Sequence, residues 1–186
     1  MTACAQCQTE FTKQRMGQRV CSPLCARRLV NAQKKQEAER KKLDRMMDRA
    51  AKEGMKTIPQ LIKEAQHEFN AFIRERDKDQ PCICCGRPLG TSDVGGGFDC
   101  GHYRSTGSAS HLRFDERNAH AQRKDCNRWG AGRAVDYRIG LVARIGLEAV
   151  EALESDNEPV KWTREVLREI KTIYRAKLRD LKKGQS

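Results

Sequence analysis

Nine cysteines in a chain of 186 residues constrain this sequence more than any other feature, and they fall into two groups. The first group has the spacing Cys-x2-Cys-x13-Cys-x3-Cys and comprises Cys4, Cys7, Cys21 and Cys25. Two close cysteine pairs joined by a short loop can place four thiolates around one zinc ion and leave no open coordination position. We therefore expect a structural four-Cys zinc finger here, with free cysteines as the alternative.

The N-terminal sequence, Met1-Thr-Ala-Cys, lacks the apolar core of a secretory signal peptide, which predicts a cytoplasmic protein. Thiols stay reduced in that compartment, and an odd number of cysteines fits a closed disulfide framework poorly. The cysteines are therefore expected to bind metal. The sequence has no run of about 18 apolar residues, so we expect no membrane partner.

The formal net charge of +12 predicts a polyanionic partner, and a nucleic acid fits better than an anionic membrane. Basic residues crowd the segment 26–52, which has helical propensity. This segment is either a solvated spacer or an arm that contacts phosphates. Its candidate DNA-binding residues are Lys34, Lys35, Lys41 and Lys42.

The rest of the chain is expected to be mostly helical. A capping box at Thr57 and an apolar stripe up to Ile73 predict a core-facing helix. A helix interrupted at Gly140 and Gly146, and a last helix capped by Thr163, are expected after the central stretch. The expected segments are a zinc finger (1–26), a basic helical linker (27–56), a helix plus the central stretch (57–133) and a helical region (134–186).

The central stretch contains His102, Asn118 and Asn127, which are separated by 15 and 8 intervening residues. A histidine can remove a proton from water near neutral pH, and carboxylate or amide oxygens suit a hard divalent cation. Asp99 supplies a carboxylate three residues before His102, and the side-chain carbonyl of Asn127 is a candidate ligand. The stretch therefore predicts a metal-dependent nuclease centre, with a structural role for His102 as the alternative.

The His-x15-Asn-x8-Asn spacing resembles the core of HNH-type endonucleases, a two-strand-and-helix metal fold. The whole chain is more closely similar to the NinG (Rap) recombination family of lambdoid phages and prophages. The matching phrases are Asn70-Ala-Phe-Ile-Arg-Glu-Arg76, Cys82-Ile-x-Cys85-Gly86, Asp99-x-Gly-His-Tyr103, Leu112-Arg-Phe-x-Glu-Arg-Asn118, His120-x-Gln122, Cys126-Asn127 and Tyr137-Arg138. The expected fold is thus α+β: a mostly helical chain around a small HNH-like core, with the N-terminal zinc finger.

The resemblance implies structure-specific cleavage of branched DNA, such as Holliday junctions and D-loops, in phage recombination. It makes His102 the general base, and it assigns Mg²⁺ or Mn²⁺ to Asp99 and Asn127. Asn118 would fix the loop that orients the catalytic histidine. His120 would be an extra metal ligand or a phosphate contact. Further residues expected to contact DNA are Arg104, Arg113, Arg123, Lys124 and Arg128.

The sequence departs from the family pattern at one cysteine. The family has Gln-Cys-x-x-Cys-Asn, whereas this chain has Arg123 in place of the first cysteine. An incomplete second zinc site remains, formed by Cys82, Cys85 and Cys126. Either Cys84, Cys100 or, less comfortably, Asp125 supplies a fourth ligand, or no zinc binds here and Arg123 makes other contacts.

Three functions compete on this evidence. The first is the branched-DNA endonuclease. The second is a zinc-finger DNA-binding protein without catalysis, and the third is an adaptor whose finger grips another recombination protein of the phage or its host. Symmetric junction cleavage would suit a homodimer, although no heptad pattern supports one.

Overall fold

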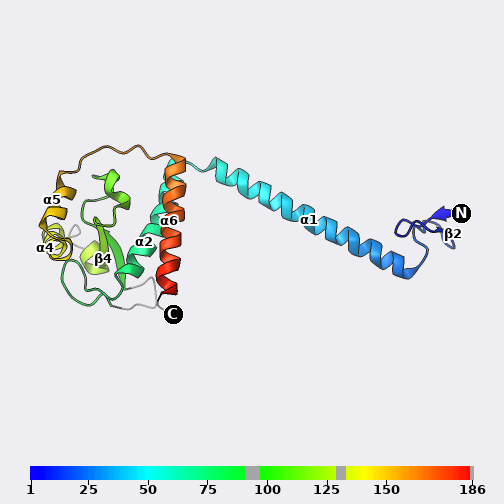
Figure 1. Ribbon diagram of the computed structural model, residues 1–186, viewed down its shortest axis with the longest axis horizontal. Coiled ribbons are helices and arrows are strands. Elements are labelled where there is room, and N and C mark those ends of the chain that lie inside the picture. Colours follow the sequence, from blue (N-terminus) through cyan, green and yellow to red (C-terminus); the bar gives the residue numbers. More distant parts are fainter. Residues whose placement is uncertain (91–96, 129–132, 185–186) are drawn as a thin grey trace. The chain divides into compact units, whose positions relative to one another are not determined.

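The computed structural model describes residues 1–90, 97–128 and 133–184, so the end of the central stretch, residues 129–132, lies outside the described ranges. The chain divides into two compact units, Met1–Lys56 and Thr57–Ser186 (Figure 1). No helix in the described ranges is long and apolar enough to cross a membrane.

The first unit is a small cysteine-bearing module followed by a long helix. Strands β1 (Thr2–Ala3) and β2 (Glu10–Phe11) pair antiparallel, and α1 spans Pro23–Met55. Ser22 caps α1, because its hydroxyl accepts a hydrogen bond from the backbone N–H of Cys25 at 3.2 Å. The 33 residues of α1 span about 50 Å. Only Cys25 is buried among them, so the helix has almost no apolar packing within its own unit.

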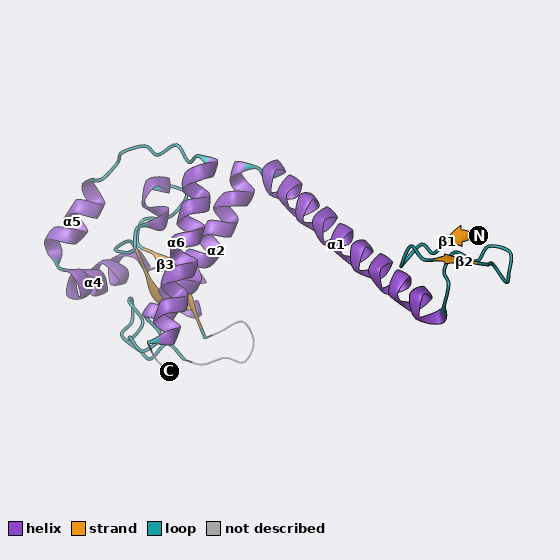
Figure 2. Cartoon of the chain, turned by 45° about the vertical axis from the view of Figure 1, so that its right-hand side comes forward, coloured by secondary structure: helices purple, strands orange, loops and turns teal. Residues whose placement is uncertain are grey.

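The second unit is built around two long helices that lie side by side, α2 (Ile58–Arg76) and α6 (Arg164–Lys183) (Figure 2). Two ion pairs join them, from Lys171 to Glu64 and from Arg175 to Glu68, each with an N–O distance of 2.6 Å. Both pairs are 107 residues apart in sequence, so the helices run in the same direction. Between them lies an aromatic cluster that includes Phe69, Phe72 and Tyr174.

A two-stranded antiparallel sheet, β3 (Phe98–His102) and β4 (Ala119–Arg123), packs against α2. The register pairs Phe98 with Arg123 and His102 with Ala119. A 3₁₀-helix, η1 (Ser110–Phe114), lies in the connection between the strands. The short helix α3 (Lys124–Arg128) follows β4 directly and contacts both strands. The chain is therefore α+β, as expected, with a segment of two strands and one helix at its centre.

Helices α4 (Ala134–Ile145) and α5 (Leu147–Ser155) enclose a second core around Tyr137, Leu141 and Leu153. The expected interruption at Gly140 is wrong, because α4 continues through it and only Gly146, at φ +86°, separates the two helices. A Cβ at position 140 would lie 1.8 Å from the carbonyl oxygen of Ile83. Glycine is therefore required there for close packing of the helix and not for a break.

Candidate functional site

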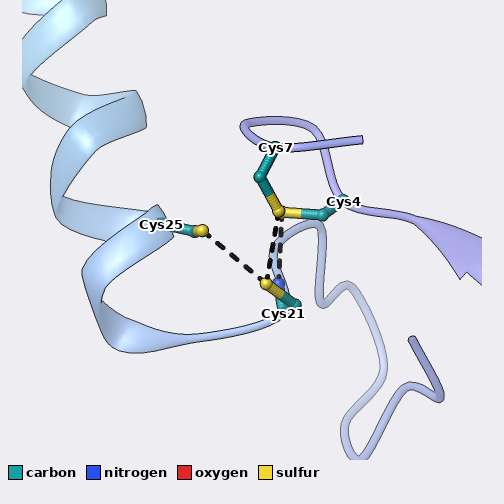
Figure 3. A group of neighbouring side chains, drawn as sticks. All are labelled: Cys4, Cys7, Cys21 and Cys25. Carbon is teal, nitrogen blue, oxygen red and sulfur yellow. Dashed lines mark hydrogen bonds between the residues drawn. The ribbon is translucent and has the colours of Figure 1, made fainter. Parts of the chain in front are cut away.

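The four N-terminal cysteines converge on one point. Their sulfur atoms all lie within 4.8 Å of one another, and Figure 3 shows Cys21 between Cys7 and Cys25. The Sγ of Cys21 is 3.6 Å from each of those two sulfurs. Sulfurs around a tetrahedral zinc ion, with bonds of about 2.3 Å, lie about 3.8 Å apart. The cluster can therefore hold a metal ion such as zinc.

The chain supports this cluster with its backbone. The N–H of Cys21 donates to the Sγ of Cys4 at 3.3 Å, and the first turn of α1 carries Cys25. Burial by itself raises the pKa of Cys4, but the N–H groups of Cys7 and Cys21 outweigh it and lower that pKa to about 6, which favours the thiolate. Only Cys4 and Cys25 are buried in the first unit. A bound metal would therefore provide most of the stabilisation that an apolar core normally provides.

A second cluster contains three thiols and no fourth. The sulfurs of Cys82, Cys85 and Cys126 lie within 4.8 Å of one another, and within the described ranges no other cysteine, histidine or carboxylate joins this group. The thiol of Cys84 accepts a hydrogen bond from the Gln122 side chain at 2.8 Å. Hydrogen bonds from the Cys84 thiol and from backbone N–H groups lower the pKa of Cys82 to about 4. Three thiolates with one open position still fit a zinc ion that takes its fourth ligand from solvent.

The backbone of Arg123 lies beside this cluster, whereas its guanidinium has other partners. Its backbone N–H donates to the Sγ of Cys82 at 3.3 Å. The guanidinium instead contacts Asp125, with 3.1 Å from Nε to Oδ1, and the carbonyl oxygen of Pro88 at 3.0 Å. Asp125 also pairs with Arg87, so it is engaged by two arginines and does not complete the metal site.

A cavity of about 310 Å³ lies between the end of β3 and the start of α4. His102 and Asn127 both line it, together with Cys100, Tyr103, Ser105, Thr106, Ala134 and Tyr137. His102 is the last residue of β3, and Asn127 lies on α3. The direct passage from β4 into α3 is what brings these two side chains to one cavity.

The ring of His102 has one engaged nitrogen. Its Nε2 lies 3.1 Å from the carbonyl oxygen of Arg113. A carbonyl oxygen only accepts, so the ring proton is on Nε2 and the lone pair is on Nδ1. Burial lowers the pKa of His102. The hydrogen bond with the Arg113 carbonyl raises this pKa in part, whereas the positive charge of Arg113 lowers it further. The ring, packed 5.9 Å from the ring of Phe69, is therefore neutral at physiological pH with Nδ1 available as a base.

Asp99 is linked to this cavity through Asn127. The Oδ2 of Asp99 lies 3.3 Å from Nδ2 of Asn127 and 3.2 Å from Nε of Arg128. Side chains alternate between the faces of a strand, so Asp99 and His102, three residues apart on β3, leave it on opposite faces. The structure thus brings Asp99 to Asn127 and Asn127 to the cavity of His102, without a direct contact between Asp99 and His102.

Asn118 is fully buried, and its side chain forms hydrogen bonds with the segment that connects β3 and β4. Its Oδ1 accepts from the N–H of Arg104 at 2.8 Å, and its Nδ2 donates to the carbonyl oxygens of Arg104 at 3.0 Å and Leu112 at 3.1 Å. Leu112 immediately precedes Arg113, whose carbonyl holds His102. Asn118 therefore supports the position of His102 indirectly, through the backbone of Leu112 and Arg113.

His120 does not line the cavity of His102. Its Nδ1 is 3.1 Å from Nη2 of Arg76 and 3.5 Å from Oδ2 of Asp77, and its Nε2 is 3.2 Å from the carbonyl oxygen of Arg117. A guanidinium only donates, so the shorter contact makes Nδ1 an acceptor and places the ring proton on Nε2. Both nitrogens have partners within the chain in this arrangement, and the assignment of His120 as a metal ligand or a phosphate contact stays a prediction.

Two of the expected DNA-binding arginines are used inside the protein. The guanidinium of Arg104 donates to carbonyl oxygens at the end of α5, including that of Leu153 at 2.9 Å. Arg113 donates to the side chain of Gln66 at 3.2 Å and to the carbonyl oxygen of Thr106 at 2.9 Å. These contacts give both half-buried arginines a structural role, and their contact with DNA stays a prediction.

The other expected DNA contacts differ in exposure. Arg123 is held by Pro88 and Asp125 as described above, and Lys124 is half-buried. Arg128 is 61% exposed beside Asp99. The four lysines on α1 are all exposed: Lys34, Lys35, Lys41 and Lys42.

Two tyrosines that line the cavity, Tyr103 and Tyr137, were not expected as site residues. Tyr103 donates its hydroxyl to Glu154, and Arg138 forms a bidentate ion pair with the same carboxylate at 2.7 and 3.1 Å. Tyr137 is buried and donates to the carbonyl oxygen of Gly101 at 3.0 Å. The family phrases that end in Tyr103 and that contain Tyr137 and Arg138 are the signals in the sequence that could have indicated these residues.

These features define an α+β protein in which each unit has a cysteine cluster and the second unit also has a cavity lined by a histidine. A family model described as "Bacteriophage Lambda NinG protein" matches residues 1–185, and the chain belongs to this family. It is similar to the proteins named "Protein ninG" of Salmonella phage P22 (48% identical), Escherichia phage 933W (49%) and Escherichia phage lambda (47%). Each match covers 125 residues, 67% of this chain, and the chain spans only 59%, 60% and 59% of these three relatives. No solved structure matches the chain.

Proposed function

We propose that this protein is a divalent-metal-dependent endonuclease with an HNH-like core that cuts branched DNA during phage recombination. One observation carries the proposal: a neutral His102 with Nδ1 available lines the same cavity as Asn127, which is hydrogen-bonded to Asp99. The order of two strands followed at once by a helix is also that of the HNH core which the spacing of His102, Asn118 and Asn127 resembles.

The residues of the chain fit the two requirements of phosphodiester hydrolysis. Nδ1 of His102 can accept a proton from an attacking water, because its lowered pKa leaves it unprotonated. Asp99 and Asn127 offer a carboxylate and an amide oxygen, which are hard ligands of the kind that Mg²⁺ and Mn²⁺ prefer. A bound divalent ion would neutralise charge that develops on the phosphate.

Charge supports DNA as the substrate. The chain has a net charge of +12, and Arg128 is exposed next to Asp99, where it can contact a phosphate close to the bond that is cut. On α1, exposed lysines such as Lys34 and Lys42 offer further positive charge that can contact DNA phosphates. Separate basic elements of this kind suit a substrate with several arms.

The test is cleavage of a four-way DNA junction by purified protein, with and without added Mg²⁺ or Mn²⁺. We expect nicking that depends on the ion. H102A should abolish nicking and retain junction binding, because Nδ1 is the base. H67A is the matched control, since His67 is exposed on α2, and it should cut like the wild type. Undiminished cutting by H102A would show that His102 is not the base.

A second assay tests the metal ligands. N127A should raise the concentration of Mn²⁺ needed for half-maximal nicking and lower the maximal rate, because one oxygen ligand is lost. H67A again serves as the control. An unchanged metal dependence in N127A would remove Asn127 from the proposed ion site while leaving the role of His102 to the first assay.

A non-catalytic zinc-finger DNA-binding protein is the alternative. The converging sulfurs of Cys4, Cys7, Cys21 and Cys25, next to the exposed basic helix α1, favour it. It predicts junction binding with a steep salt dependence but no nicking under any divalent ion. The junction assay therefore separates the two functions directly.

A further inference from the structure

We propose that a second cavity of the 57–186 unit binds a phosphate group. Its volume is about 550 Å³, and it shares no lining residue with the cavity of His102. The charged side chains and the histidine that line this cavity are Arg76, Arg117, Arg144, Asp77, Glu116 and His120. The proposal does not rest on the endonuclease activity proposed above, because it concerns binding alone.

The charges that line this cavity do not cancel. Three guanidinium groups face two carboxylates, which leaves an excess of one positive charge, and His120 adds none because its Nδ1 accepts from Arg76. Two partners outside the lining leave this balance unchanged, because Lys177 pairs with Glu116 at 2.5 Å and Asp115 pairs with Arg117 at 2.7 Å. An oxyanion is therefore the kind of ligand that balances the site.

Arg144 is the residue with the least complete set of partners. Its Nη2 donates to the carbonyl oxygen of Pro81 at 2.9 Å, whereas its buried Nη1 has no hydrogen-bond acceptor among the described residues. The nearest carboxylate oxygen, Oδ2 of Asp77, is 3.9 Å away. A buried N–H without an acceptor costs about 1–3 kcal/mol, so an added oxyanion that engages this guanidinium is favoured.

Asp77 does not complete the pairing of Arg144, because other donors already occupy its carboxylate. Arg76 donates to both oxygens, at 2.7 and 3.0 Å, and the backbone N–H of Ala121 donates to Oδ2 at 2.9 Å. Arg76 also donates to the carbonyl oxygen of Ala119 at 2.9 Å. The site is therefore fixed before a ligand arrives, and binding loses little side-chain entropy.

Phosphate is the oxyanion that best fits this site. The planar fork of a guanidinium matches phosphate oxygens in a bidentate manner, and the whole chain is strongly basic. His120 and His102 leave the strand pair on opposite faces, because His102 pairs with Ala119, the neighbour of His120 on β4. A phosphate held here would thus be distinct from one held at the cavity of His102.

The test measures the melting temperature of the full chain in inorganic phosphate and in chloride at the same ionic strength. We expect phosphate to raise the melting temperature of the wild type more than chloride does, and R144Q to lose this difference. R175Q is the matched control, because Arg175 is 62% exposed and paired with Glu68 away from the cavity. R144K, which keeps the charge without the fork, should retain part of the effect, and far-UV circular dichroism checks that each variant is folded.

Binding of a short single-stranded oligonucleotide distinguishes the two sources of the phosphate. If the ligand is part of a nucleic-acid strand, R144Q lowers the affinity and reduces the salt slope by about 1 relative to R175Q. If only the effect of inorganic phosphate is lost, the ligand is a small phosphorylated molecule. The proposal is overturned if phosphate stabilises the wild type no more than chloride, or if folded R144Q keeps the full effect.

Discussion

Nε2 of His102 lies 3.1 Å from the backbone carbonyl oxygen of Arg113, and this contact places the ring proton on Nε2 and leaves the lone pair on Nδ1. Arg113 belongs to η1, and the preceding carbonyl, that of Leu112, is held by the buried side chain of Asn118. The position of the imidazole therefore depends on a residue that does not touch it. Because of these contacts, we expect Asn118 to contribute measurably to the free energy of unfolding of the 57–186 unit.

Replacing Asn118 by alanine should destabilise the 57–186 unit by about 3 kcal/mol, because three hydrogen bonds are lost and backbone groups of Arg104 and Leu112 are left buried without partners. Urea unfolding followed by tryptophan fluorescence measures this. N157A is the control, since Asn157 is exposed, and it should cost less than about 1 kcal/mol. Equal losses in the two variants would contradict the role assigned to Asn118.

Gly140→Ala should also destabilise this unit, by about 3 kcal/mol, because the new Cβ would lie 1.8 Å from the carbonyl oxygen of Ile83 and force α4 away. The change should improve helix propensity by only about 1 kcal/mol, so the steric effect wins. Thermal unfolding by circular dichroism measures the result. G54A is the matched control: Gly54 is also helical, a Cβ there meets nothing within 4 Å, and the melting temperature should not fall.

The sequence was sufficient for features that depend on spacing and propensity. The intervals between Cys4, Cys7, Cys21 and Cys25 predict their convergence, because short loops between close pairs leave few other arrangements. The helix from Ile58 to Arg76 and its buried face follow from the capping box and the apolar stripe. Such features are local, so no knowledge of distant contacts is required.

The features that the sequence did not reveal depend on distant backbone groups. The sequence does not reveal that the guanidinium groups of Arg104 and Arg113 donate to the carbonyl oxygens of Leu153 and Thr106. A backbone carbonyl has no signature in the sequence, since every residue has one. Gly140 was misread for the same reason, because the close neighbour that requires a glycine is the carbonyl of Ile83.

Acid should weaken the fold partly through Glu154. Hydrogen bonds from Arg138 and Tyr103 lower the pKa of Glu154 from 4.5 to about 2. A pKa that is lower in the folded state contributes stability above about pH 4.5 and loses it as the pH falls towards about 2. Because the side chain is 33% exposed, we expect this contribution to be only about 1 kcal/mol.

The measurement is the urea midpoint of wild type and E154Q between neutral pH and about pH 3. E154Q should be less stable than the wild type near neutral pH, and the difference should shrink as the pH falls below about 4.5. E151Q, an exposed substitution on the same helix, should follow the wild type throughout. A constant difference between E154Q and the wild type across this range would contradict the prediction.

The incomplete second cluster predicts a gain of metal binding in R123C. The N–H of residue 123 already donates to the Sγ of Cys82 at 3.3 Å, so a cysteine side chain at this position starts beside the three thiolates. A fourth thiolate would close the site and raise its zinc affinity by roughly 10–100-fold or more. Competition with a zinc chelator measures the affinity, and cobalt(II) substitution reports the number of thiolates through its sulfur charge-transfer absorption.

R123A is the matched control for this substitution. Both variants lose the contacts of the guanidinium with Asp125 and with the carbonyl oxygen of Pro88, but only R123C adds a ligand. R123C should therefore bind zinc more tightly than R123A, while the four-Cys site in residues 1–56 contributes equally to both. Equal zinc affinity and equal cobalt absorption in the two variants would mean that position 123 does not face the thiolates of Cys82, Cys85 and Cys126.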